Sequence, residues 1–216
     1  MKFDHFLPST IQVIENKQAF ISEHCKGKRV LHLGCVDAGL TLEAIEKGNF
    51  LQAKIAEVAD IVVGIDSNAE GIAFLDQHKN NREKFYCLDV EKINSDAIKE
   101  KIDIVVAGEI LEHLSNVGNF LKGIHELLLK HKAIMIIAVP NAYSIRHIKA
   151  IKSGREIVHP DHNYYFSYVT LKALLQKFQM KATDIYLYNT PYSEINGFSY
   201  TSIMQLLDRY DIRRRI

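Results

Sequence analysis

The sequence has no excess of charge of either sign. Its 216 residues include 27 Lys and Arg against 26 Asp and Glu, so the formal net charge is +1. A chain this close to neutrality does not create the global field that recruits nucleic acid or an anionic membrane surface. We therefore expect no membrane partner. A nucleic-acid partner would have to be held without a basic stripe.

Cysteine is scarce and unpaired. The chain has three cysteines, Cys25, Cys35 and Cys87, and no C-x-x-C pair. An odd number without metal-ligand spacing argues against a disulfide framework and against a structural zinc site. The composition instead favours a reducing compartment.

Long apolar runs and repeats are also missing. No stretch approaches 18 uninterrupted apolar residues, so we expect no membrane span. Residues 1–20 carry charges throughout and show no apolar core of a signal peptide, so we expect a cytoplasmic protein. We find no internal repeat and no long Gly/Ser linker. We predict a single domain over residues 1–216, with a lid at about 141–167.

What is present is a set of short apolar runs rich in β-branched residues. Segments with helical periodicity separate the first five of these apolar runs. The segment between the first two runs, for example, is "TLEAIEKGNFLQAKIAEVA" (41–59). This alternation predicts an α/β fold with a doubly wound, mostly parallel seven-stranded sheet. We expect the last two runs to pair antiparallel at one sheet edge. The predicted strands are Arg29–Leu33, Ile61–Ile65, Lys84–Leu88, Ile102–Ala107, Ala133–Val139, Ala182–Tyr188 and Ser199–Leu207.

The turn after the first strand reads "LHLGCVDAGLT" and suits a nucleotide-like ligand. Gly34 and Gly39 permit a tight turn and a close ligand approach. Their spacing imitates a P-loop, but Leu40 stands where its lysine belongs. A dinucleotide fingerprint fails as well, because Val36 replaces the middle glycine. A cofactor without phosphates and a plain chain reversal remain as alternatives.

Acidic residues follow two successive strands. Asp66 closes the second strand, where a carboxylate can accept both hydroxyls of a ribose. Asp89 follows the third, in a position to meet an adenine amino group. Since ligands bind beside the carboxyl ends of strands in open α/β sheets, the pair predicts a binding rim.

In this motif order the chain resembles the class I S-adenosylmethionine-dependent methyltransferases. The motifs are "VLHLGCVDAG", "VGIDSN", "CLDV", "VVAGEILEHL" and "MIIAVPN". The resemblance implies an enzyme with a Rossmann-like fold that takes S-adenosylmethionine. His32 departs from it, because an acidic residue is usual there. The residues implied to bind the cofactor are Leu33, Gly34, Cys35, Gly39, Asp66, Ser67, Asp89, Val90 and Glu109.

The fourth strand ends in "GEILEHL". If a helical turn follows, Glu109, Glu112 and His113 stand at i, i+3 and i+4 and share one face. Such a set can bind a divalent metal, and it can equally cap and pack the turn.

Further along, "HPDHNYYF" (159–166) precedes a predicted helix. E-x-x-E-H with a downstream histidine loop resembles the small-RNA 2′-O-methyltransferases and, less completely, the ubiquinone-pathway O-methyltransferases. That resemblance implies His162 as a fourth metal ligand, and His159 would then either support the metal ligands or face the substrate. Two carboxylates and two imidazoles suit Mg²⁺, Mn²⁺ or Fe²⁺. Without a metal, His113 or His162 is the candidate base, and Glu109 completes the predicted catalytic set.

Three functions follow. The leading one is O-methylation of a hydroxyl on a small molecule or sugar. An RNA 2′-O-methyltransferase is the alternative, and a non-catalytic S-adenosylmethionine-binding module is the third. A homodimer is compatible with any of them.

Overall fold

A single mixed sheet forms the centre of the molecule. The computed structural model describes residues 7, 11–37, 41–188 and 202–208, the last segment by its backbone alone. Eight strands lie in the order β1-β7-β8-β6-β5-β2-β3-β4. Their bounds are β1 Gln12–Ile14, β2 Arg29–Leu33, β3 Ile61–Asp66, β4 Glu83–Cys87, β5 Ile104–Gly108, β6 Ile134–Pro140, β7 Lys181–Tyr188 and β8 Ser202–Asp208.

Strand pairing confirms the predicted doubly wound, mostly parallel sheet. β2, β3, β4, β5 and β6 pair in parallel, whereas β8 runs antiparallel to both β6 and β7. All seven predicted strands are present. The short β1 adds an eighth, parallel to β7, so β7 does not form the edge of the sheet. Residues 199–201 of the last predicted strand lie outside the described residues.

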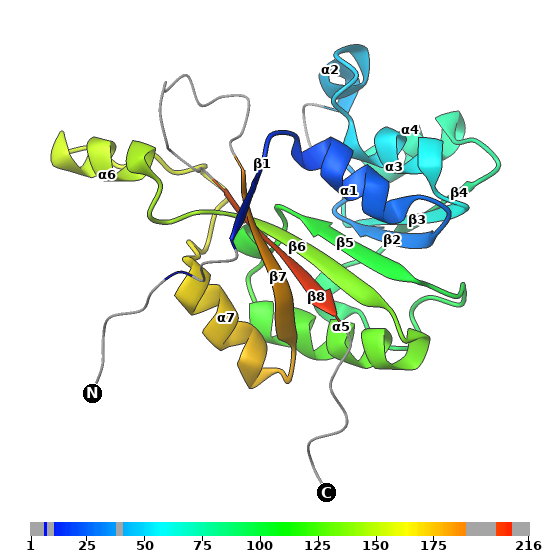
Figure 1. The fold of residues 1–216 in the computed structure, drawn as a ribbon. Helices are drawn as coiled ribbons and strands as arrows, with labels where there is room; N and C mark the ends of the chain where they lie inside the picture. The colour runs from blue at the N-terminus through cyan, green and yellow to red at the C-terminus, as the bar shows by residue number, and fades with distance from the viewer. Residues whose placement is uncertain (1–6, 8–10, 38–40, 189–201, 209–216) are drawn as a thin grey trace, which may run out of the picture.

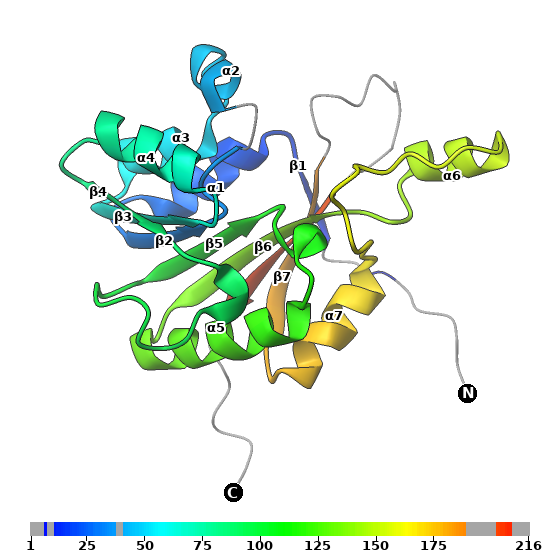
Figure 2. The same ribbon diagram turned by 180° about the vertical axis from the view of Figure 1, so that it is seen from behind.

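Helices cover both faces of the sheet (Figures 1 and 2). On one face lie α1 Lys17–Cys25, α3 Leu51–Val58 and α4 Ala69–His78, and on the other lie α5 Val117–His131 and α7 Tyr168–Lys177. Alternate residues of one strand enter the two cores: Leu31 packs with α5, while Val30 packs with α1 and α3. This two-sided burial explains why the central strands read as continuous apolar runs.

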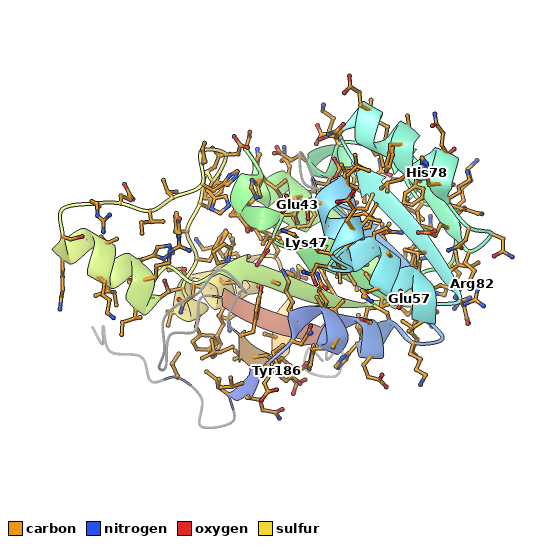
Figure 3. All side chains as sticks on the ribbon, turned by 90° about the horizontal axis from the view of Figure 1, so that it is seen from above. Glu43, Lys47, Glu57, His78, Arg82 and Tyr186 are labelled. Atoms are coloured by element: carbon orange, nitrogen blue, oxygen red, sulfur yellow. The ribbon has the colours of Figure 1, made fainter. Side chains whose placement is uncertain are left out.

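The first helix, α1, is capped at its N-terminus and packs against strand β7. Asn16 caps its N-terminus by accepting a hydrogen bond from the backbone N–H of Ala19 at 3.0 Å. Phe20 packs on the ring of Tyr186, a β7 residue labelled in Figure 3, with ring centroids 4.5 Å apart. These contacts place Lys17, the first residue of α1, near the ends of the central strands.

Two segments differ from what their apolar patterns suggest. The segment 41–59 is not one helical stretch but two, α2 Thr41–Glu46 and α3, because Gly48 takes a left-handed φ of 63° between them. Leu42 of α2 is 62% exposed, so α2 does not continue the buried face of α3. The third predicted strand is not buried on both faces either. As β4 it forms the sheet edge, and Lys84 and Tyr86 are exposed.

The segment predicted as a lid begins directly after β6. It contains α6 Ile145–Lys152, capped by Ser144, which extends away from the sheet in all three views (Figures 1–3). The chain then returns to the sheet, where the N–H of Ala142 donates to the carbonyl of Phe166 at 2.8 Å. None of the described helices is long and apolar enough to cross a bilayer.

Candidate active site

A pocket of about 930 Å³ lies at the carboxyl ends of the central strands. Its walls bring together the first turn, the rim after β3 and β4, the end of β5 and the histidine loop. Of the residues predicted for the site, Leu33 is buried in the core and does not line the pocket, and Gly39 lies outside the described residues. The predicted residues that do line it are Gly34, Cys35, Asp66, Ser67, Asp89, Val90, Glu109, Glu112, His113 and His162.

The turn after β2 requires its glycine. Gly34 has a φ of 69°, and a Cβ atom added there would lie 3.0 Å from Cδ1 of Ile110. The N–H groups of Gly34 and Cys35 both donate to the carbonyl of Ile65, at 2.8 and 3.2 Å. The next N–H, that of Val36, donates to Oδ2 of Asp66 at 3.1 Å. Hence Asp66 stabilises the turn as well as facing the pocket.

The two rim carboxylates are already oriented by the backbone. Besides its bond to the turn, Asp66 accepts from the N–H of Asn68 through Oδ1, at 2.9 Å. Asp89 accepts from the N–H of Glu91 at 2.9 Å and pairs with Lys92 at 2.9 Å. The hydrogen bond from Lys92 lowers the pKa of Asp89, so this carboxyl is charged at neutral pH. Each carboxylate retains lone pairs for a ligand, since two oxygens offer about four acceptor sites.

Glu109 occupies a strained position at the end of β5. Its φ is 61°, a left-handed value that glycine favours. Lys17 Nζ lies 3.0 Å from one carboxylate oxygen, and the Tyr188 hydroxyl donates to the other at 2.9 Å. Burial alone would raise the pKa of Glu109, but the charge and hydrogen bond of Lys17, with smaller effects of Tyr188 and His162, hold the pKa below its usual range.

Glu112 has the opposite environment. It is only 1% exposed, and neither carboxylate oxygen has a hydrogen-bond partner among the described residues. Burial, with a contribution from the negative charge of Glu109, raises the pKa of Glu112 to about 8. The side chain is therefore largely protonated at neutral pH.

Three histidines gather beside this turn. Ring nitrogens of His113, His159 and His162 lie within 4.8 Å of one another. The His113 and His162 rings meet edge to face with centroids 4.6 Å apart. Burial lowers the pKa of both, and the neighbouring imidazoles lower it further, so both are neutral at pH 7. Neutral imidazole can accept a proton or bind a metal.

Hydrogen bonds attach the histidine loop, residues 159–166, to the turn that follows β5. The backbone N–H of Asn163 donates to the carbonyl of Glu112 at 2.7 Å, and its side-chain amide donates to the carbonyl of His113 at 3.0 Å. The Tyr164 hydroxyl donates to the carbonyl of Ser115 at 3.1 Å. These bonds hold the ring of His162 beside that of His113.

The carboxylates do not join the histidines. The residues after β5 form one 3-10 turn, η2 Leu111–His113, in which Glu112 is buried and His113 is exposed. Among the described residues, the cluster with metal-binding spacing contains the three histidines and no carboxylate. The third member is His159, which was expected either to support the metal ligands or to face the substrate. The shared face predicted for Glu109, Glu112 and His113 is therefore not formed by this turn.

His32 faces the pocket from the middle of the sheet. It is 3% exposed, and its Nδ1 lies 2.8 Å from Oε1 of Gln52, whose amide donates to Glu83 at 3.0 Å. Burial lowers the pKa of His32 to about 4, against the opposing effect of the Gln52 bond. A neutral imidazole thus stands where the resemblance leads us to expect an acid.

Comparisons with known proteins agree with this architecture. Residues 3–184 match the methyltransferase domain family. The chain is 36% identical over 118 residues to a ubiquinone biosynthesis O-methyltransferase of Rhodopseudomonas palustris, strain HaA2, covering 53% of this chain and 41% of that protein. A second ubiquinone biosynthesis O-methyltransferase, from Bradyrhizobium diazoefficiens, is 33% identical over the same length. This chain thus spans less than half the length of these relatives.

Solved structures share the fold. A small RNA methyltransferase has a TM-score of 0.65 at 14% identity, covering 95% of this chain and 27% of that one. A Burkholderia thailandensis 1,6-didemethyltoxoflavin-N1-methyltransferase, solved with S-adenosylhomocysteine, has a TM-score of 0.59 at 18% identity, covering 89% and 76%. The family match, the sheet order and the pocket beside the glycine turn all lead to one assignment: the chain belongs to the methyltransferase domain family, of the class I, S-adenosylmethionine-dependent type.

Proposed function

We propose that this protein transfers the methyl group of S-adenosylmethionine to a hydroxyl of a small molecule or a sugar. The observation that carries the proposal is the single pocket that joins the glycine turn and acidic rim to His113 and His162. The relatives named ubiquinone biosynthesis O-methyltransferases support a small hydroxyl acceptor.

The cofactor would lie along the ends of β2, β3 and β4. Gly34, Cys35 and the turn that reaches Gly39 would cradle the methionine end. Asp66 with Ser67 would bind the ribose hydroxyls, and Asp89 with Val90 would border the adenine. Because Asp66 and Asp89 are held by backbone N–H groups, they would meet the cofactor with little loss of side-chain entropy.

The reaction itself requires alignment and removal of one proton. S-adenosylmethionine, when bound, would supply an activated methyl group to the acceptor oxygen and would be left as a neutral thioether. His113 or His162 takes the hydroxyl proton. Both are neutral at pH 7 because burial lowers their pKa, which suits a general base.

Some of the predicted metal-binding atoms have no other partner among the described residues. Both oxygens of Glu112 and Nδ1 of His162 are buried without a partner among the described residues, as expected of donor atoms awaiting a ligand. His113 and His162 would bind Mg²⁺, Mn²⁺ or Fe²⁺, and the other two predicted ligands, Glu112 and Glu109, would have to approach the histidines to complete the site. Such an ion, when bound, lowers the pKa of a hydroxyl that it contacts.

One observation favours the RNA alternative. Four cations, Arg146, Lys149, Lys152 and Arg155, lie in and after α6, and Arg146 also lines the pocket. No described acidic residue forms an ion pair with any of them. A local basic segment of this kind could contact phosphates although the whole chain is almost neutral.

One assay separates these functions. Release of S-adenosylhomocysteine is measured with hydroxylated aromatic compounds, with free sugars, and with an RNA oligonucleotide ending in a free 2′-hydroxyl, each with Mg²⁺, Mn²⁺ or EDTA. We expect turnover with a small hydroxyl acceptor. Turnover with RNA alone would establish the alternative, and tight cofactor binding without turnover on any acceptor would indicate a non-catalytic module.

A further inference from the structure

Two cations line the pocket, and one of them has no acidic partner among the described residues. Lys17 and Arg146 are the only Lys or Arg side chains in the described part of the wall. Lys17 is paired with Glu109 at 3.0 Å. Arg146 is half-buried, and no described acidic residue forms an ion pair with it. A guanidinium stays charged at physiological pH, and a partly buried charge without a counter-ion is unfavourable. Arg146 can therefore accommodate an anionic ligand.

Most acids of the pocket have other partners. Asp66 and Asp89 belong to the cofactor rim, and Glu91 accepts hydrogen bonds from two backbone N–H groups after η2. The side chain of Asp161, in the histidine loop, is 78% exposed, and its carboxylate lies 3.9 Å from Nδ1 of His159. An anionic group that enters with a ligand would thus complete the charge balance around Arg146 where the protein's own carboxylates do not.

Side-chain contacts fix the start of α6, where Arg146 lies. Ser144, which caps the helix, is 2% exposed, and its Oγ lies 3.0 Å from Nδ1 of His147. The ring of His147 meets that of Tyr165 edge to face, with centroids 5.1 Å apart. Although α6 extends away from the sheet (Figure 1), its first turn is therefore held against the histidine loop.

Arg146 lies on the same side of the pocket as the candidate bases. Burial raises the pKa of Tyr165, and the charge of Arg146 is close enough to oppose that rise. Glu156 also acts on Tyr165, but it is exposed and does not line the pocket. The ring of Tyr165 lies 5.9 Å from that of His162. One small ligand can therefore contact Arg146 and a candidate base together.

We propose that Arg146 binds an anionic group of the acceptor, a carboxylate or a phosphate, and so selects small acidic hydroxyl compounds. The proposal rests on the proposed function and adds the chemical class of its acceptor. A planar guanidinium matches either anion with two parallel N–H donors. An acceptor held in this way would present its hydroxyl to His113 or His162.

The position of Arg146 favours a small anion over the backbone of an RNA. Of the four cations in and after α6, only Arg146 lines the pocket, whereas Lys149, Lys152 and Arg155 do not. An RNA strand would use several of these cations, because its phosphates repeat along the chain. A single anionic group inside the pocket requires Arg146 alone.

The test compares ligands that differ in one anionic group. Calorimetry in excess S-adenosylhomocysteine compares protocatechuate with its carboxamide, and ribose 5-phosphate with ribose. The native protein should bind the anionic member of one pair at least tenfold more tightly, because charge-assisted hydrogen bonds exceed neutral ones. Arg146→Met should bind both members of that pair with the affinity that the native protein has for the neutral one. The pair that shows the preference identifies the anion as carboxylate or phosphate.

The matched control is Lys149→Met, which removes an exposed cation of α6 that does not line the pocket. It should keep the full preference. The proposal would be overturned if the native protein preferred the anion in neither pair, or if the preference survived in Arg146→Met. An equal loss in Lys149→Met would overturn it too, since that result indicates an extended basic surface of the kind that RNA contacts.

Turnover separates this proposal from the proposed function. Methylation of a hydroxyl acceptor by a protein without the anionic preference would retain the proposed function and remove the role of Arg146. An anionic preference in a protein that methylates no hydroxyl acceptor would retain the anion site at Arg146 and remove methyl transfer.

Discussion

The rings of His113 and His162 meet edge to face, 4.6 Å apart, although one follows β5 and the other belongs to the loop before α7. The contact depends on bonds from Asn163 to the carbonyls of Glu112 and His113. Because these are backbone acceptors, the loop is positioned by the shape of η2 and not by the identity of the side chains in that turn. The histidine pair can therefore be altered without detaching the loop.

Asp66→Ala should weaken S-adenosylhomocysteine binding at least tenfold. The carboxylate is the predicted ribose ligand, and it also accepts from the N–H of Val36, so its loss loosens the glycine turn. Calorimetry on the native protein and the variant measures the effect. Glu70→Ala, which removes an exposed acid outside the pocket, is the control and should bind normally. An unchanged affinity in Asp66→Ala would remove this residue from the site.

His162→Ala should abolish any dependence of activity on divalent metal and leave S-adenosylmethionine affinity within about twofold. The residue belongs to the histidine cluster and not to the turn and rim proposed to bind the cofactor. Initial rates across a Mn²⁺ titration measure the metal dependence, and calorimetry with the cofactor measures its affinity. His78→Ala, on the far end of α4 (Figure 3), should behave as the native protein. A variant that keeps the native metal response would show that His162 is not a ligand.

The lowered pKa of His32 should remove about 2 kcal/mol from the free energy of unfolding between pH 7.5 and pH 5, whatever the other groups contribute. Its pKa is lowered to about 4 in the folded state by burial, against about 6.5 when unfolded. Below pH 6.5 the unfolded chain takes up the proton first, so stability is lost as pH falls toward 4. At pH 7.5 and above the imidazole is almost entirely neutral in both states and contributes almost no pH dependence.

Urea unfolding of the native protein and of His32→Gln at the two pH values isolates this residue. The other histidines and the carboxylates titrate in both proteins and cancel in the comparison. The variant should lose about 2 kcal/mol less than the native protein between pH 7.5 and pH 5. Parallel losses would mean that the imidazole of His32 is accessible to protons in the folded state.

Much of the fold and part of the site could be predicted from local sequence. The buried strands appear in the sequence as apolar runs. The acidic residues directly after two of these strands, Asp66 and Asp89, line the pocket. The paired His113 and His162 followed from motif resemblance. These signals work because the end of a parallel strand fixes where the next few side chains lie.

Other features depend on geometry that no local pattern encodes. Glu109 takes a left-handed φ, and its carboxylate then pairs with Lys17 from α1, far away in the sequence. The helical periodicity of residues 41–59 does not reveal that the chain leaves the helical conformation at Gly48. His32 departs from the cofactor motif of the family, and the sequence does not show that Gln52 of α3 is its hydrogen-bond partner. Each depends on contacts between elements, which spacing along the chain does not reveal.

Hydrogen exchange should divide the predicted lid into two parts. Residues 145–158 contain α6, which extends away from the sheet, so their amides should exchange fastest among the described segments. The N–H groups of Asn163 and Tyr164, which donate to the carbonyl of Glu112, should be protected. We expect S-adenosylhomocysteine with an acceptor to slow exchange in residues 145–158, because Arg146, Ile157 and Val158 line the pocket. Mass spectrometry of peptides from both parts, with and without ligand, measures this, and the α5 core serves as the slow reference. Slow, ligand-independent exchange across the whole of residues 141–167 would make the segment a fixed wall of the pocket and not a lid.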